Sequence, residues 1–314
     1  YSGTQIKEFS NIIDKPIDLK GDFTGRVAKN CHSSDSKKND VLAGANKITN
    51  QFIDNCLSAQ SERPLVAFSG DSHSLAIFPI SEVIASTSQY DVFSHSRDGC
   101  AFPSQGETTR KNCKEVQSSV AKMMIKEMSN RKNGSFFVAT SYLVSHFGYT
   151  GSHRKQFTRH SNGSRSSVDK NLARFIDASK NLAGKLKNIN ATMILVAPLP
   201  QHPAFTPELC SKQWFRHSLA VADICQKTKR DFLENQRKHI VEAINTLASE
   251  IKNIYIFDPF NKFCDINYCY VTRNNTYLFS DDDHLSKEGA IMISNDLLSM
   301  IRQINYQKNN HTNK

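Results

Sequence analysis

Short apolar runs that alternate with helical patterns constrain the fold of this 314-residue chain more than any other feature. The first run, Pro64–Phe68, is continuously apolar and stops at Ser69 and Gly70, which is typical of a buried parallel strand that ends in a tight turn. The further runs are Tyr90–Phe93, Phe136–Thr140, Met193–Ala197 and Tyr255–Phe257. Strands that alternate with helices form right-handed βαβ units, so we predict an α/β fold with helices on both faces of a parallel sheet.

Helical periodicity fills the segments between these runs. Apolar residues recur at the helical spacing at 116–125, Leu172–Leu186 and Phe232–Ile251, and a last such pattern follows Ser286, a candidate N-cap. Another helix is expected around Asn46–Leu57.

Length and composition favour one large domain with a well-buried core. We predict a polar linker and packed extension at 1–62, the main domain at 63–306, and a disordered tail rich in Asn and Lys at 307–314. The longest apolar runs are far shorter than the roughly 20 residues that a membrane span needs. Tyr1 is not preceded by an apolar signal core, so we expect any targeting segment to have been removed or to lie upstream.

The net charge of +10 suits an anionic partner, but Lys and Arg are scattered along the chain and no recognised docking motif accompanies them. We therefore predict no nucleic-acid partner. The densest basic stretch, His153–Arg165, is interpreted as a solvated loop, with contact to a substrate or a lipid surface as the alternative.

The eight cysteines fall in pairs that are close in sequence. The predicted disulfides are Cys31–Cys56, Cys100–Cys113, Cys210–Cys225 and Cys264–Cys269. Eight cysteines allow 105 pairings, and eight buried free thiols remain the alternative. The paired short spacings of a zinc site are absent, so no metal is predicted. Disulfides indicate an oxidising compartment, either the periplasm or the exterior.

The turn after the first predicted strand reads Gly70-Asp-Ser-His73. Ligands of doubly wound sheets bind beyond the carboxyl ends of the strands, and a serine at such a strand-to-helix turn can hold its hydroxyl clear of the sheet. Ser72 is therefore a candidate nucleophile. Gly, Asp and Ser are also the ordinary residues of turns and caps, so the motif alone does not exclude a structural role.

A second polar block, Asp281-Asp-Asp-His284-Leu-Ser286, precedes the last predicted helix. A carboxylate three residues before a histidine can accept a hydrogen bond from Nδ1 and leave Nε2 free to take a proton from a serine. Spacing favours Asp281 as that partner, whereas Asp282 and Asp283 are interpreted as solvated or capping. The alternative is that the acidic run only stabilises the helix dipole.

Together these blocks resemble the SGNH (GDSL-like) hydrolase superfamily, and more closely the SGNH domains attached to membrane acyltransferase-3 proteins that modify bacterial surface glycans. The resemblance extends to Cys100 in the loop Gly99–Pro103 and to the closely spaced Cys264 and Cys269, and it covers roughly residues 31–305. It implies a three-layer α/β/α domain with a flavodoxin-like, five-stranded parallel sheet.

The resemblance also implies roles for individual residues. Ser72 would attack an acyl ester, His284 would act as base and then acid, and Asp281 would orient His284. The backbone N–H groups of Ser72 and Gly99 would form the oxyanion hole. The asparagine that the superfamily places after the third strand is missing, and Ser141 is the candidate to supply a hydroxyl instead. His73 is interpreted as turn packing or a pocket wall.

Three functions follow as hypotheses. The first is a periplasmic or extracellular, membrane-tethered O-acyltransferase that passes an acyl group, usually acetyl, to a sugar hydroxyl of a surface polysaccharide such as lipopolysaccharide O-antigen. Its partner would be an upstream membrane acyltransferase-3 domain that delivers acyl groups derived from acetyl-CoA, and the chain itself would need no cofactor. The second is a secreted carbohydrate or lipid esterase that uses water as the acceptor. The third is a glycan-binding module with a vestigial triad.

Overall fold

The computed structural model of the chain describes residues 32–34, 62–103, 113–131, 134–141, 143–144, 165–205, 210, 225–274 and 276–312. The strands are β1 (His32–Ser34), β2 (Leu65–Gly70), β3 (Asp91–Ser96), β4 (Phe136–Thr140), β5 (Thr192–Val196), β6 (Lys227–Lys229), β7 (Ile254–Phe257), β8 (Tyr268–Tyr270), β9 (Thr272–Arg273) and β10 (Thr276–Tyr277). The helices are α4 (Ser72–Ala76), α5 (Phe78–Ser86), α6 (Cys113–Ser129), α8 (Arg165–Lys187), α11 (Arg230–Glu250), α12 (Phe260–Phe263) and α13 (Lys287–Thr312).

The main sheet is parallel and has the strand order β1-β3-β2-β4-β5-β7. The five strands from β3 to β7 have the flavodoxin-like order, which confirms the predicted fold class. The short strand β1 adds a sixth member next to β3, from within the segment predicted as an N-terminal extension.

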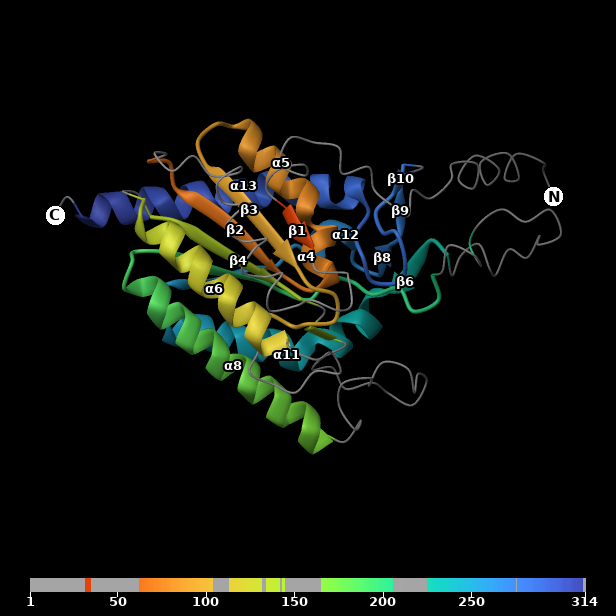
Figure 1. The fold of residues 1–314 in the computed structure, drawn as a ribbon. Coiled ribbons are helices and arrows are strands. Elements are labelled where there is room, and N and C mark those ends of the chain that lie inside the picture. The colour runs from red at the N-terminus through yellow and green to blue at the C-terminus, as the bar shows by residue number, and fades with distance from the viewer. Residues whose placement is uncertain are drawn as a thin grey trace, which may run out of the picture.

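Helices cover both faces of this sheet (Figure 1). Side chains alternate along a strand, so β2 contributes Val66 and Phe68 to the apolar cluster under α5 and α13, and Leu65 and Ala67 to the cluster under α6, α8 and α11. This two-sided burial explains why the predicted strands are continuous apolar runs.

The five predicted strands of the main sheet are all present, with ends that differ by at most three residues, and the predicted helices correspond to α6, α8, α11 and α13. Ser286 is the N-cap of α13 as predicted, since its Oγ accepts a hydrogen bond from the Gly289 N–H at 3.0 Å. That helix continues to Thr312, so most of the predicted tail at 307–314 is helical. The helix expected at Asn46–Leu57 lies outside the described residues, and the domain boundary at 62 stays a prediction.

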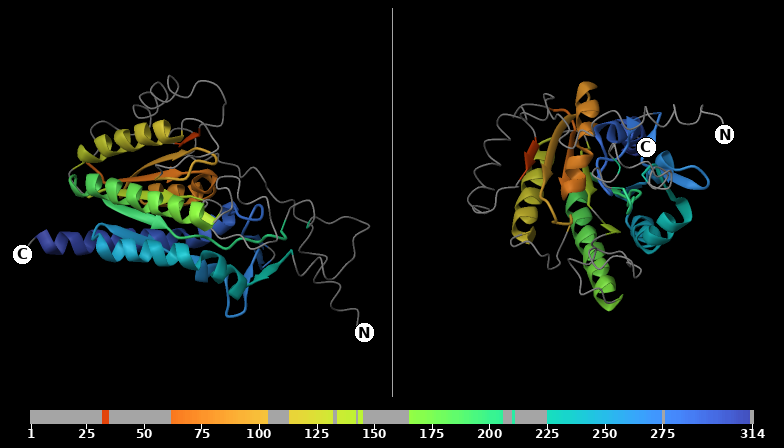
Figure 2. Two further views of the ribbon diagram at one scale, coloured as in Figure 1. Left: turned by 90° about the horizontal axis from the view of Figure 1, so that it is seen from below. Right: turned by 90° about the vertical axis from the view of Figure 1, so that its right-hand side faces the viewer.

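Two small antiparallel strand pairs, β6 with β8 and β9 with β10, lie beyond the carboxyl ends of the main strands (Figure 2). The segment that carries β8 to β10 leads directly into the Asp281–His284 block. Within the described residues, no helix is both long and apolar enough to cross a membrane.

Candidate active site

Ser72 is the first residue of α4, directly after the carboxyl end of β2. Asp71 caps this helix, because its Oδ1 accepts a hydrogen bond from the His73 N–H at 2.9 Å. Gly70 is required by close packing, since a Cβ there would lie 1.6 Å from the carbonyl oxygen of Thr140 at the end of β4. The Gly-Asp-Ser sequence therefore brings the Ser72 backbone close to two strands at once.

His284 lies in the loop between β10 and α13, and backbone hydrogen bonds hold this loop. The Ser280 N–H donates to the His284 carbonyl at 2.9 Å, and Phe279 and Leu285 form an isolated β-bridge. Gly289 at the start of α13 also has no room for a side chain, because a Cβ there would lie 2.1 Å from the Leu278 carbonyl oxygen. The packing of α13 thus sets the position of His284.

The structure brings the three predicted triad residues together. The Nε2 of His284 lies 2.7 Å from the Ser72 Oγ, although 212 residues separate the two in sequence. On the other side of the ring, Nδ1 lies 2.8 Å from Oδ2 and 3.0 Å from Oδ1 of Asp281. Asp281 Oδ1 also accepts the backbone N–H groups of Asp283 and His284, at 3.0 and 2.7 Å. This arrangement allows a proton to pass from the serine hydroxyl to a histidine oriented by a carboxylate.

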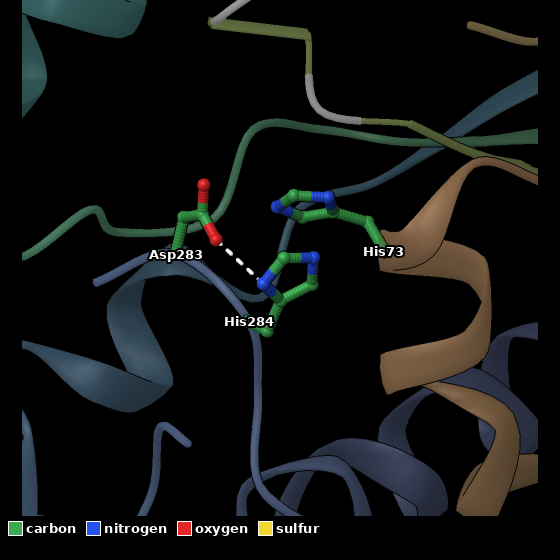
Figure 3. Close-up of side chains that lie close together, drawn as sticks. All are labelled: His73, Asp283 and His284. Atoms are coloured by element: carbon green, nitrogen blue, oxygen red, sulfur yellow. Dashed lines mark ion pairs between the residues drawn. The ribbon is translucent and has the colours of Figure 1, made fainter. Parts of the chain in front are cut away.

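A second carboxylate, which the sequence interpretation assigned to solvent or capping, also contacts the histidine. Asp283 Oδ1 lies 2.6 Å from His284 Nδ1, and the Asp283 side chain is only 10% exposed (Figure 3). The sequence shows an acidic residue at that position, but its distance from the histidine along the chain does not reveal where its side chain points. The backbone of the 281–284 loop turns Asp283 inward.

Both carboxylates change the protonation of the histidine. Burial alone would lower the pKa of His284, but its hydrogen bonds to Asp281 and Asp283 and their negative charges raise that pKa to about 11. Burial opposes the ionisation of Asp281, yet the hydrogen bond to His284 and its charge hold the pKa of Asp281 well below the ordinary value. The two carboxylates therefore favour the doubly protonated ring, and a doubly protonated ring must lose the proton on Nε2 before it can act as a base.

His73, the residue next to the candidate nucleophile, lies against the ring of His284. The ring centroids of His73 and His284 are 4.5 Å apart, and His73 is buried. His73 also lines a small pocket that is partly open to solvent, together with Ser141, Leu143, Val144, Leu199 and Asp283. The lining of this pocket agrees with one of the two predicted roles of His73, turn packing or a pocket wall, whereas its contact with the His284 ring was not predicted.

The loop that carries Gly99 is held by several contacts. Gly99 has a φ of 68°, which favours glycine, and the Arg97 N–H donates to the Gly70 carbonyl at 3.0 Å. The Cys100–Cys113 disulfide and a 2.6 Å hydrogen bond from Gln117 Nε2 to the Cys100 carbonyl join this loop to α6. The roles of the Ser72 and Gly99 N–H groups as oxyanion donors remain predictions.

The hydroxyl of Ser141, the third candidate, contacts the same loop. Its Oγ accepts the Phe102 N–H at 2.8 Å and lies 3.4 Å from the Phe102 carbonyl, to which it can donate its proton. These contacts of Ser141 connect the end of β4 to the Gly99 loop. An oxyanion role for Ser141 would require this hydroxyl to turn away from Phe102.

Three of the predicted disulfides are present: Cys100–Cys113, Cys210–Cys225 and Cys264–Cys269. The pairing of Cys31 with Cys56 lies outside the described residues.

The side chains of His73, Asp283 and His284 place possible metal-ligand atoms within 4.8 Å of one another. However, the 2.6 Å between Asp283 Oδ1 and His284 Nδ1 is a hydrogen-bond distance. Two ligands of one zinc ion at their usual bond lengths of about 2.0–2.2 Å and tetrahedral angles would lie farther apart. We interpret Asp283 and His284 as a hydrogen-bonded pair with the His73 ring beside them, and the absence of a metal stays a prediction.

Comparison with solved structures finds the same fold elsewhere. The periplasmic domain of a lipopolysaccharide acetyltransferase from Salmonella ser. Paratyphi A superimposes with a TM-score of 0.57 at 15% identity, over 87% of this chain and 92% of that one. A GDSL-like lipase from Bacteroides thetaiotaomicron has a TM-score of 0.45 at 12% identity, over 83% of this chain and 98% of that one. No match was found among curated protein sequences.

The model of one protein family, described as "SGNH domain (fused to AT3 domains)", matches residues 30–299. This range includes both Ser72 and His284 and all six strands of the main sheet. The chain therefore belongs to the family of SGNH domains that are fused to AT3 domains.

Proposed function

We propose that this domain transfers an acyl group, most simply acetyl, through Ser72 to a sugar hydroxyl of a surface polysaccharide. The observation that carries the proposal is the 2.7 Å contact between Ser72 Oγ and His284 Nε2, in a chain whose family is fused to AT3 domains. This contact disfavours the alternative of a glycan-binding module with a vestigial triad. Glycan binding alone does not require a serine hydroxyl within hydrogen-bond distance of a histidine.

The reaction proceeds in two half-reactions. Neutral His284 takes the Ser72 proton while Oγ attacks the acyl carbonyl, and then returns that proton to the leaving group of the donor, which leaves an acyl-serine. The sugar hydroxyl enters next, gives its proton to His284 Nε2 and attacks the acyl carbon, which frees Ser72. The candidate oxyanion donors are the N–H groups of Ser72 and Gly99.

The donor and the location form part of the same proposal. An acyltransferase-3 domain of the same protein would deliver acyl groups derived from acetyl-CoA, and this chain would need no cofactor of its own. The fold neighbour named as a periplasmic domain of a lipopolysaccharide acetyltransferase supports a periplasmic, membrane-tethered location and an O-antigen type of acceptor. The three disulfides support an oxidising compartment.

The first test is covalent labelling of the isolated chain with a fluorophosphonate probe at pH 7 and pH 9. We expect labelling of Ser72 that disappears in Ser72→Ala. A matched control, Ser74→Ala, removes another hydroxyl from the same helix and should label like the unmodified chain. Absence of labelling in the unmodified chain at both pH values would contradict a serine enzyme.

The second test separates transfer from hydrolysis. In cells that carry the full-length protein, Ser72→Ala should abolish acylation of the surface glycan, as measured by NMR of the purified polysaccharide. The soluble chain should hydrolyse p-nitrophenyl acetate slowly, because a positioned sugar hydroxyl gains an effective concentration that bulk water lacks. Fast hydrolysis together with unchanged glycan acylation in Ser72→Ala would favour the secreted-esterase alternative.

A further inference from the structure

Asp283 is the more buried of the two carboxylates at His284. Its side chain is 10% exposed, against 39% for Asp281, and its Oδ1 lies at 2.6 Å from Nδ1, closer than either oxygen of Asp281. Figure 3 shows the Asp283 carboxylate directed at His284, with the His73 ring beside both. Asp283 also lines the pocket next to the triad.

Asp281 also accepts backbone hydrogen bonds, whereas Asp283 accepts none among the hydrogen bonds of the described residues. The Oδ1 of Asp281 accepts two backbone N–H groups of its own loop, from Asp283 and His284. Asp281 therefore shapes the loop as well as contacting the ring. Because Nδ1 carries one proton, it can form a full hydrogen bond with only one carboxylate at a time, and the other acts on the ring through its charge.

We propose that Asp283 is a second positioning carboxylate for His284, which holds the ring together with Asp281 and favours its protonated form. The proposal rests on the proposed serine mechanism. With two carboxylates around one imidazole, the acid step of the mechanism is favoured and the base step requires higher pH. Removing the charge of Asp283 should therefore let His284 act as a base at lower pH, while Asp281 continues to orient the ring.

The charged and titratable groups near His284 come from three parts of the chain. Its own loop supplies Asp281, Asp282 and Asp283, and α4 supplies His73, whose Nδ1 lies 3.4 Å from Asp71 Oδ1. The loop after β5 supplies His202, whose backbone N–H donates to the Asp282 carbonyl at 2.6 Å. Burial lowers the pKa of His202 to about 3, so His202 is neutral over the tested range and does not contribute a competing charge.

The test measures the pH dependence of fluorophosphonate labelling of Ser72 for the unmodified chain, Asp283→Asn, Asp281→Asn and Asp282→Asn. Asp283→Asn should move the midpoint of the profile down by about 1 to 3 pH units, the usual effect of one close opposite charge. Asp281→Asn should lower the plateau itself by about 100-fold or more, because orientation is lost. Asp282→Asn removes the same charge one residue away and should shift the midpoint far less.

A direct readout does not depend on activity. In ¹⁵N NMR spectra of the histidine side chains, the titration of His284 should move to lower pH in Asp283→Asn and return toward the original value in Asp283→Glu, which restores the charge. An unshifted titration in folded Asp283→Asn would overturn the proposal, as would a loss of plateau rate without a shift. If Asp283→Asn does not fold, Asp283→Ser and Asp283→Glu are compared in the same way. Failure of the unmodified chain to label would instead count against the proposed function.

Discussion

At the scale of single residues, the glycine of the Gly-Asp-Ser turn shows how packing selects a residue. Gly70 has no room for a side chain against Thr140, so Gly70→Ala should force β2 and β4 apart. We expect a loss of about 2–4 kcal/mol in the free energy of unfolding, within the range known for overpacked or strained sites, and slower labelling of the adjacent Ser72.

Gly184 in α8 is the matched control for that substitution, because nothing lies within 4 Å of a Cβ added there. Gly184→Ala should stabilise the helix by about 0.5–1 kcal/mol, since alanine has the higher helix propensity. Urea unfolding followed by circular dichroism measures both variants. Equal effects of the two substitutions would contradict the close-packing argument for Gly70.

At the scale of secondary-structure elements, the loop between β3 and α6 depends on cross-links for its position. Replacing both Cys100 and Cys113 by serine removes a bridge that spans 13 residues in sequence. In the chain-entropy relation, a loop of this size accounts for about 3 kcal/mol, so we expect a comparable loss in the free energy of unfolding.

The same double variant should also slow fluorophosphonate labelling of Ser72, because Gly99 lies in the loop that the disulfide holds. Gln117→Leu separates the two anchors, since it removes the hydrogen bond to the Cys100 carbonyl but keeps the disulfide. An unchanged labelling rate in the double cysteine variant would show that the remaining contacts, such as Ser141 with Phe102, hold the loop without the disulfide.

At the scale of the whole molecule, the His284 cluster makes stability depend on pH. The raised pKa of His284, about 11, contributes stability that is fully present below the unfolded value of about 6.5 and is lost as pH rises toward 11. The lowered pKa of Asp281 contributes stability that is present above about 3.9 and is lost in acid. The combined contribution is therefore largest between about pH 4 and 6.5.

His284→Gln removes this dependence, and urea unfolding at several pH values measures it. The difference in urea midpoint between the unmodified chain and His284→Gln should be largest near pH 6 and should shrink steadily by pH 10. A difference that stays constant over this range would mean that the histidine is not held in its protonated form.

The sequence by itself determined the alternation of strands and helices, because local apolar periodicity records which face of each element is buried. It also identified Ser72, Asp281 and His284, whose short motifs lie directly beside predicted element ends. Only the tertiary structure decided that Asp283 faces His284, that the His73 ring lies against the His284 ring and that the Ser141 hydroxyl contacts Phe102. These contacts depend on the direction of side chains in loops that come together from distant parts of the chain. Loop backbone conformation sets those directions, and no periodic pattern in the sequence records it.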